Sequence, residues 1–152
     1  MIQTKKYFKN AEATAQVIDS EGWLHTGDLG TIDIENNVFI RGRNKTMILS
    51  GSGQNIYPEE IEAKLNNMPY VMESLVVESN GKLIALVCPD YEAVDSEGVD
   101  QNQLEVLMEE NRKLLNSMVA AYEGVSKVQL YPHEFEKTPK KSIKRYLYST
   151  NK

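Results

Sequence analysis

Cysteine and histidine are scarce in this chain of 152 residues. Cys88 is the only cysteine, so the chain can form neither an internal disulfide bond nor a metal cluster held by several cysteines. His25 and His133 are the only histidines, and they are too few and too far apart in sequence to suggest a metal site. The sequence therefore predicts no metal centre on this chain.

Long hydrophobic runs are also missing. The longest uninterrupted apolar run, residues 83–88, is far too short to cross a bilayer, and the first six residues lack the apolar core of a secretory signal. We therefore expect a cytoplasmic location. The composition, 41% hydrophobic and 26% charged, is typical of a soluble globular protein, and the length suits one domain, or one domain with an extra arm.

Charge is distributed unevenly along the chain. The net charge is -5, yet residues 133–152 hold six lysines or arginines against two glutamates. A basic end on an acidic body can engage phosphate, nucleic acid or an acidic partner surface. The alternative is a solvated helix face without a partner, and the charge pattern by itself leaves both interpretations open.

Turn residues and hydrophobic periodicity predict an α+β chain. The expected elements, in order, are a helix over residues 10–15, a hairpin over 28–43, a strand over 47–49, a helix from Tyr57 or Pro58 to Met68, strands over 71–78 and 82–88, a polar loop over 89–99, a helix over 102–122, a strand over 128–131 and a tail helix over 140–148. We therefore expect a small mixed β-sheet flanked by helices and preceded by a β-hairpin arm.

Three local signals support these elements. Asn80-Gly81, between two predicted strands, is one of the stronger hairpin signals. Pro58 followed by two glutamates suits the first turn of a helix and the positive end of its dipole. Residues 102–122 carry apolar side chains at helical spacing, which predicts that they face the core. These side chains are Leu104, Leu107, Met108, Leu114, Leu115, Met118, Val119 and Tyr122.

Two loops have the composition of ligand-binding turns. Asp28 follows Thr26-Gly27 directly before a predicted strand, where a carboxylate can accept hydrogen bonds from adjacent ribose hydroxyls. An isolated Thr-Gly-Asp is more often a turn that caps its own backbone. Residues 50–53, Ser-Gly-Ser-Gly, lack the Gly-Lys-Ser/Thr of a P-loop, so we interpret them as a flexible turn that presents backbone to a ligand.

Three motifs follow one another closely: Gly-Trp-Leu-His-Thr-Gly-Asp at residues 22–28, Gly-Arg-Asn-Lys at 42–45, and a glycine-rich loop running into Tyr-Pro-Glu-Glu-Ile-Glu at 51–62. This order resembles the carboxyl-terminal part of the adenylate-forming (AMP-binding) enzymes, and residues 136–148 look most like the long-chain fatty acid CoA ligases. The resemblance covers nearly the whole chain. It implies that residues 1–45 are the end of the amino-terminal adenylation domain and the hinge, and that 46–152 are the small mobile domain.

The resemblance assigns roles to four residues. Asp28 and Arg43 match the acid and the arginine that hold the ribose of ATP in this family. Lys45 matches the hinge about which the small domain rotates between the two half-reactions, and a polar residue there stays solvated in both orientations. Gly53 matches a glycine beside the pantetheine arm of the incoming thiol, on the CoA side of the site.

The tail resembles the last motif of the family, Thr-x-Ser-Gly-Lys-Ile-x-Arg, whose lysine reaches the acyl carboxylate and the ATP α-phosphate. A lysine suits this role because the transition state gathers negative charge on phosphate oxygens. Aligned on Thr138, Ile143 and Arg145, the lysine position is filled by Ser142. Our preferred catalytic lysine is Lys141, acting after a local register shift. The weaker candidates are Lys140 and Lys144.

The resemblance implies that the chain is one part of an ATP-dependent acid–thiol ligase. The intact enzyme would convert a carboxylate and ATP to an acyl-adenylate and pyrophosphate, then transfer the acyl group to CoA. Its expected cofactors are ATP, CoA and Mg²⁺. Its expected partners are the amino-terminal adenylation domain in cis and a small-molecule acid, with no nucleic acid, and with a membrane surface met only through a lipid substrate.

The chain does not contain the ATP loop or the acyl pocket expected of the large domain, so we expect it to have no ligase activity alone. Two alternatives remain open at this point. The first is another adenylating enzyme, of the peptide-synthetase or aryl-acid type. The second is a non-catalytic binding module that docks through its basic tail.

Overall fold

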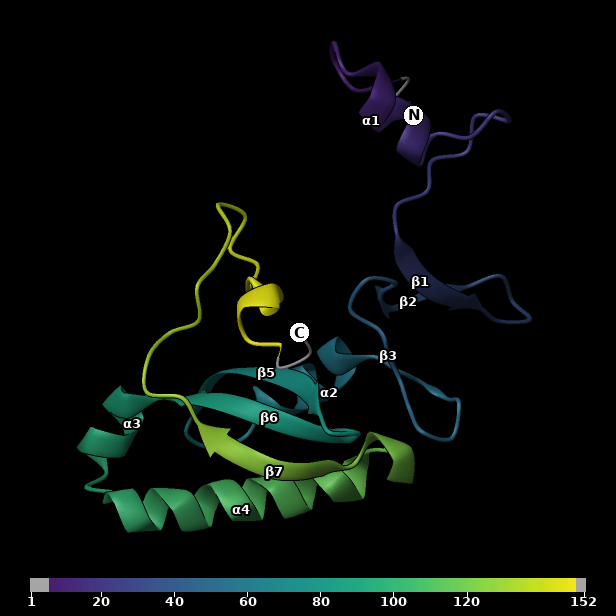
Figure 1. Ribbon diagram of the computed structural model, residues 1–152. Coiled ribbons are helices and arrows are strands. Elements are labelled where there is room, and N and C mark those ends of the chain that lie inside the picture. The colour runs from purple at the N-terminus through teal and green to yellow at the C-terminus, as the bar shows by residue number, and fades with distance from the viewer. Residues whose placement is uncertain (1–5, 150–152) are drawn as a thin grey trace. The chain divides into compact units, whose positions relative to one another are not determined.

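A computed structural model of the chain describes residues 6–149. The chain forms two compact units, Met1–Lys45 and Thr46–Lys152 (Figure 1). Among the described residues, no helix has both the length and the apolar character needed to cross a membrane.

The first unit contains a short helix and a β-hairpin. Helix α1, Ala11–Val17, begins after Asn10, whose side chain accepts a hydrogen bond from the Ala13 N–H, as expected of an asparagine cap. Strands β1, Asp28–Ile32, and β2, Val38–Arg43, pair in antiparallel fashion. The predicted helix and hairpin are both confirmed.

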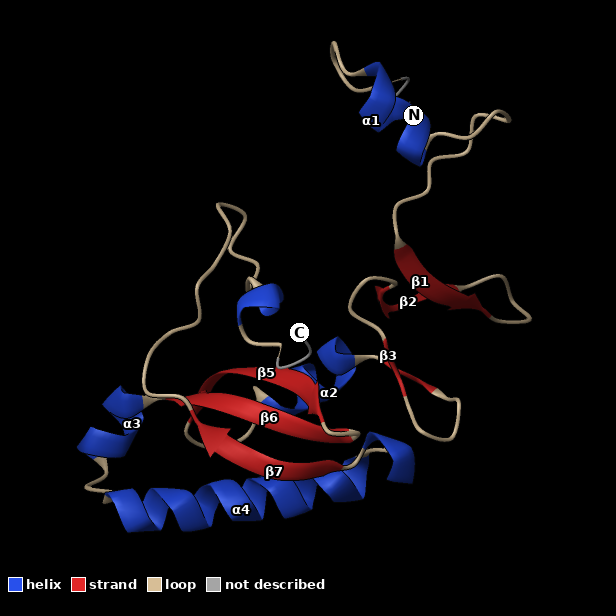
Figure 2. Ribbon diagram, in the orientation of Figure 1, coloured by secondary structure: helices blue, strands red, loops and turns tan. Residues whose placement is uncertain are grey.

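The second unit is built on a three-stranded mixed sheet. Its strands are β5, Val71–Ser79, β6, Lys82–Pro89, and β7, Val125–Leu130, in the order β5-β6-β7 (Figure 2). Strands β5 and β6 are antiparallel, and β6 and β7 are parallel. Asn80 and Gly81 both have positive φ, 51° and 73°, which is the backbone that a tight two-residue hairpin turn requires. The predicted α+β architecture is therefore correct.

Helices cover one face of this sheet. Helix α2, Pro58–Leu65, packs on β5, and helix α4, Gln101–Met118, runs along β7 (Figure 1). The main hydrophobic core lies between these helices and the sheet. Its most deeply buried members include Ile61, Leu65, Val76, Ala85, Val87, Leu104, Leu115 and Val125.

The tail of the chain covers the other face. Leu75 and Val77 alternate with Val76 along β5 and form a second buried cluster with Phe135. Alternate side chains of a strand point to opposite faces, so β5 is buried on both sides at its centre. The tail is therefore the second covering layer of the sheet.

A smaller two-stranded ladder precedes α2. Strands β3, Ile48–Leu49, and β4, Asn55–Ile56, pair in antiparallel fashion around the glycine-rich loop. The sequence predicted β3 but not β4, because two residues are too few to show a periodic pattern.

Two predictions about the segment after β6 are wrong. Residues 89–99 are not a polar loop throughout, because helix α3, Tyr91–Ser96, begins after Asp90, whose side chain accepts the Ala93 N–H at 3.1 Å. The long helix ends at Met118 rather than Tyr122, and a 3₁₀ turn, Ala121–Glu123, follows it. Leu114 and Met118 are about half exposed instead of belonging to the core.

The predicted tail helix is also wrong. Residues 137–143 form a narrow hairpin with one bridge, Lys137 to Ile143, and only Arg145–Leu147 make a 3₁₀ turn. The Thr138 N–H donates to the Ser142 carbonyl at 2.8 Å, which closes the hairpin. Lys141 has φ 61°, a left-handed conformation that no α-helix contains. This backbone replaces the helix that the spacing of apolar residues suggested.

Candidate functional site

Asp28 and Arg43 lie directly opposite each other on β1 and β2. Opposed residues of an antiparallel pair point to the same face, and here Arg43 Nε lies 2.9 Å from Asp28 Oδ1. Gly27, with φ 76°, turns the chain into β1, and its carbonyl accepts the Asn44 N–H at 2.9 Å. The Asp28 carboxylate thus faces the arginine, and both groups remain partly exposed. The pair therefore presents carboxylate acceptors and guanidinium donors side by side.

Asp19 organises the segment that leads to this pair, a role that the sequence prediction missed. Its Oδ1 accepts the N–H groups of Glu21 and Trp23, and its Oδ2 lies 2.9 Å from His25 Nε2. The backbone hydrogen bond from Trp23, helped by the His25 hydrogen bond, lowers the pKa of the Asp19 carboxyl. An aspartate before Ser-Glu-Gly is a turn signal that could have revealed it.

Lys45 is exposed and is the last residue of the first unit. The second unit begins at Thr46, whose hydroxyl donates to Glu59 Oε1 at 2.6 Å. The hydroxyl of Thr46 is therefore tied to the start of helix α2. The boundary between the units falls at the bond between these two residues.

Gly53 lies in the loop between β3 and β4. Its φ is 84°, a backbone conformation that favours glycine, and a Cβ atom there would meet no other atom of the described chain within 4 Å. The Ser50 N–H donates to the Gln54 carbonyl at 2.8 Å and closes the loop. A cleft of about 570 Å³ lies beside it. Its lining includes Ser50, Gly51 and Ser52 of this loop, Gly81 and Lys82 of the β5–β6 turn, and Tyr122 and Gly124.

Three of the basic tail residues are engaged in ion pairs. Lys137 Nζ lies 2.8 Å from Glu73 Oε2, Lys144 Nζ lies 2.9 Å from Glu136 Oε2, and Arg145 pairs with a carboxylate of α2. Hydrogen bonds to these carboxylates raise the pKa of both Lys137 and Lys144. Lys144, a weaker candidate in the sequence, is thus held by an acid.

Lys140 and Lys141 lie in the exposed turn of the tail hairpin. We call this turn, residues 138–142, the lysine turn. Within residues 6–149 neither forms an ion pair. Lys141, with φ 61°, occupies the position at which the aligned family motif has glycine, the residue best suited to this conformation. In that alignment Ser142 stands at the lysine position. Both lysines nevertheless present ammonium groups from the same turn.

A buried acid beneath the tail, Glu62, was not predicted as a site residue. Glu62 is 7% exposed, and burial raises its pKa to about 7 although the charge of Arg145 lowers it. From the sequence, Glu62 is predicted only as part of a helix start, with no role in a site. Its partner is 83 residues away, and no local spacing indicates the pairing.

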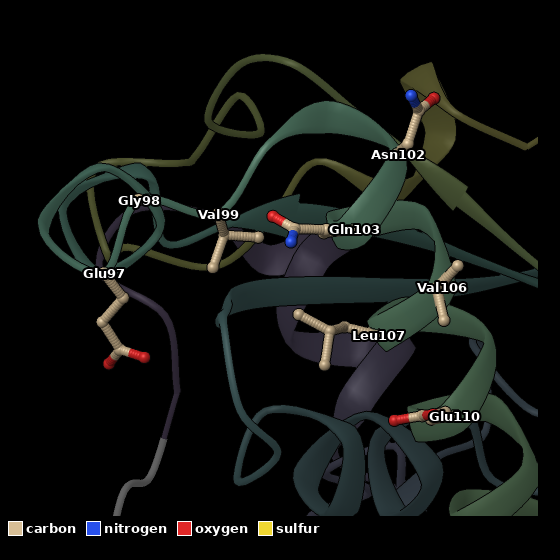
Figure 3. Close-up of a pocket in the computed structure, with 8 residues that line it drawn as sticks. All are labelled: Glu97, Gly98, Val99, Asn102, Gln103, Val106, Leu107 and Glu110. Carbon is tan, nitrogen blue, oxygen red and sulfur yellow. The ribbon is translucent and has the colours of Figure 1, made fainter.

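A separate hollow lies along the start of α4. Its volume is about 490 Å³, and its lining includes Val99, Val106 and Leu107 together with Glu97 and Glu110, which Figure 3 draws as sticks. None of the residues predicted as site residues lines it. We therefore assign it no part in the site.

No protein-family model matches the chain. Similar curated proteins include 4-coumarate-CoA ligase 1 from Narcissus pseudonarcissus, 35% identical over 129 residues, which cover 82% of this chain and 21% of that protein. They also include the long-chain-fatty-acid–CoA ligase FadD13 from Mycobacterium tuberculosis, 45% identical over 76 residues, which cover 50% of this chain and 15% of that protein.

Solved structures agree with these relatives. The adenylation domain of a carboxylate reductase from Mycobacterium chelonae matches 94% of this chain and 24% of that chain with a TM-score of 0.82; at 20% identity it shows the fold. ATP-bound MatB from Rhodopseudomonas palustris is 29% identical, with a TM-score of 0.67 over 95% of this chain and 27% of that chain.

The chain belongs to the adenylate-forming, AMP-binding enzyme family, and it fits the carboxyl-terminal part of such an enzyme. The curated relatives reported above are CoA ligases. The match spans only 14–23% of the length of the curated relatives.

Proposed function

We propose that this chain is the carboxyl-terminal part of an ATP-dependent acid–thiol ligase, most like a long-chain fatty acyl-CoA synthetase. The whole enzyme would convert a carboxylate and ATP to an acyl-adenylate and pyrophosphate, and would then transfer the acyl group to CoA. The observation that carries this proposal is the Asp28–Arg43 pair at 2.9 Å, which has the exposure and the donors and acceptors that a ribose requires.

The lysine turn would supply positive charge during the first half-reaction. As the α-phosphate is attacked, negative charge gathers on its oxygens, and an ammonium held nearby stabilises that charge. Lys141 is our first choice and Lys140 the alternative, because neither is held by an acid within the described part of the chain. Lys144 is disfavoured by its contact with Glu136.

The second half-reaction would use the other side of the small domain. Rotation about Lys45 would bring the loop of Gly53 toward the acyl-adenylate, and the thiol arm of CoA would pass beside that loop. A loop with exposed glycines lets a ligand approach the backbone closely. The adjoining cleft is large enough for part of such an arm.

ATP and CoA are the proposed cofactors, with Mg²⁺ as the usual companion of ATP phosphates. Residues 6–149 contain no cluster of three or more metal-binding side chains, and we assign no residue of this chain to the ion. The proposed partner is an amino-terminal adenylation domain in cis, in a cytoplasmic enzyme that meets membranes only through a lipid substrate.

The experiment compares this chain with a full-length ligase that contains it. Pyrophosphate release and acyl-CoA formation are measured with fatty acids of several lengths and with 4-coumarate. We expect turnover of the fatty acids by the full-length enzyme and none by the 152-residue chain. Robust turnover by the chain alone, or none by the full-length enzyme with any acid, contradicts the proposal.

A further inference from the structure

A glutamate of β5 binds the segment that leads into the tail hairpin, residues 135–137, which we call the first leg. Glu73 Oε1 accepts the Phe135 N–H at 2.9 Å, and its Oε2 lies 2.8 Å from Lys137 Nζ. The Glu73 side chain is only 13% exposed, so water competes weakly for either bond. One carboxylate thus fixes both the backbone and a side chain of this leg.

A glutamate of α2 binds the segment that follows the tail hairpin, residues 144–148, which we call the second leg. Glu62 Oε1 accepts the Val76 N–H at 2.6 Å, and its Oε2 pairs with the Arg145 guanidinium. Arg145 also donates to the Val76 carbonyl at 3.4 Å and lies 3.7 Å from Glu59 Oε1. The arginine is therefore bonded to both the helix and the strand beneath it.

The two legs are also bonded to each other. The Lys144 N–H donates to the Glu136 carbonyl at 2.8 Å, and the Glu136 N–H donates to Tyr148 Oη at 2.8 Å. The Tyr148 ring packs edge-on against Phe135 and Tyr131, with centroids 5.1 and 5.5 Å away. These contacts join the two legs to each other, so the attachment of the legs to the domain sets the direction of the hairpin.

We propose that Glu62 and Glu73 are positioning residues, which clamp one leg each and so fix the direction in which the lysine turn presents Lys140 and Lys141. A single anchor would leave the hairpin free to pivot, whereas two anchors on different elements define its orientation. A group that stabilises a transition state acts only when its support holds it close to the productive geometry. This inference rests on the proposed function, in which the turn serves the α-phosphate.

Amide hydrogen exchange of the 152-residue chain tests the clamp. The measurement is made at pH 8, above the Glu62 pKa of about 7, so that the carboxylate is charged. In Glu62→Gln and in Glu73→Gln, the N–H groups of Thr138 and Lys144, both bonded within the hairpin, should exchange about ten-fold faster, since each change weakens a hydrogen bond to a charged group.

A double-mutant cycle shows whether the buried pair acts as a unit. Glu62→Gln, Arg145→Gln and their combination should accelerate exchange in the hairpin to a similar extent, because each removes the same ion pair. Glu109→Gln is the matched control: it breaks the Glu109–Arg112 pair of α4, with a 2.6 Å contact, far from the tail in sequence, and should leave hairpin exchange unchanged.

Amides of α4 report whether each variant is folded. If Glu62→Gln removes their protection as well, that variant has unfolded, and Glu73→Gln on the other leg provides the measurement. Hairpin exchange that stays at the wild-type rate in a folded Glu73→Gln, or accelerations that simply add in the double variant, would overturn the clamp.

Kinetics of the full-length ligase separate positioning from folding. Glu73→Gln should lower kcat for acyl-adenylate formation about ten-fold, with the KM for ATP within about two-fold and with thiol transfer from a preformed adenylate intact. Unchanged adenylation despite a loosened hairpin would overturn the positioning role. A wild-type full-length protein with no ligase activity would instead refute the proposed function, while the exchange result would still decide the clamp.

Discussion

Arg43 Nε and Asp28 Oδ1 lie 2.9 Å apart at directly opposed positions of the β1–β2 ladder. The pair is set by the register of the hairpin, so neither residue depends on a long loop for its place. A charged pair on a strand ladder presents a fixed set of donors and acceptors to a ligand, and it is correspondingly sensitive to the loss of one member.

Asp28→Asn should weaken nucleotide binding by the full-length ligase. The amide keeps one acceptor but loses the negative charge, and with it the pairing to Arg43. We expect the KM for ATP to rise about ten-fold or more, the cost of one charged hydrogen bond. Glu35→Gln, in the turn of the same hairpin, is the control and should leave the KM unchanged. An unchanged KM in Asp28→Asn argues against a ribose site.

Gly30→Ala should destabilise the β1–β2 hairpin. A Cβ atom at Gly30 would lie 2.8 Å from the Phe39 carbonyl oxygen, and this backbone contact cannot give way cheaply. We expect a loss of about 1–3 kcal/mol, seen as faster amide exchange in both strands. Gly51→Ala provides the comparison, because its added methyl group meets nothing within 4 Å. Equal effects of the two changes would contradict this account.

Lys45→Pro should separate the two half-reactions of the full-length ligase. Proline fixes φ near −65°, so the junction between the two units could no longer change its dihedral angles freely. We expect one half-reaction to fall far more than the other when acyl-adenylate formation and thiol transfer are assayed separately. Lys45→Ala keeps the backbone free and serves as the control. Equal losses in both steps, or no loss, would count against a hinge at this residue.

Substitutions in the lysine turn should identify the catalytic lysine. Lys141→Ala should slow adenylation by about 10²–10³ and spare thiol transfer, as expected when one charge-stabilising contact is lost. Lys140→Ala is the neighbouring comparison. If Lys141→Ala is silent and Ser142→Lys accelerates adenylation, the motif position has lost its lysine and Lys141 has not replaced it. If all three changes are silent, the turn has no part in the chemistry.

The stability of the Thr46–Lys152 unit should depend on pH through Glu62. Burial raises the pKa of this carboxyl from 4.5 to about 7, so the folded protein binds its proton more tightly than the unfolded chain does. The resulting stabilisation is complete below pH 4.5 and is lost as the pH rises through about 7.

The wild type should therefore lose on the order of 2–3 kcal/mol of unfolding free energy, relative to Glu62→Gln, between pH 4.5 and pH 8. Urea unfolding followed by circular dichroism at several pH values measures this difference. Subtracting the unfolding free energy of the glutamine variant removes the contribution of the other titrating groups. A difference that stays constant, or that grows with pH, would contradict the raised pKa.

The elements that the sequence predicted correctly are those specified by local chemistry. Asn80-Gly81 defines its hairpin because both residues tolerate positive φ, and Pro58 marks a helix start because its missing N–H has no partner there in any case. Asp28 and Arg43 share one hairpin, so their proximity also follows from the sequence. Domain roles, the hinge and the assignment of the catalytic lysine stay predictions.

The failures concern contacts that are distant in sequence. Ile143 and Leu147 have helical spacing, but the tail is instead held by hydrogen bonds and ion pairs to the carboxylates of Glu62 and Glu73. No local sequence pattern indicates these contacts. Helix α3 was missed because six residues after Asp90 are too few for a periodic signal. The exposed Leu114 shows that spacing gives a helix face without saying how far the core extends along it.

The aromatic and aliphatic side chains of the tail lie on an otherwise open sheet face, over Leu75, Val77 and Cys88. A truncated protein that ends after β7 would therefore lose more than a reactive turn. It would display a row of apolar side chains on a β-sheet, the kind of surface that promotes self-association. The tail thus shields an apolar sheet face, whatever chemistry takes place at its tip.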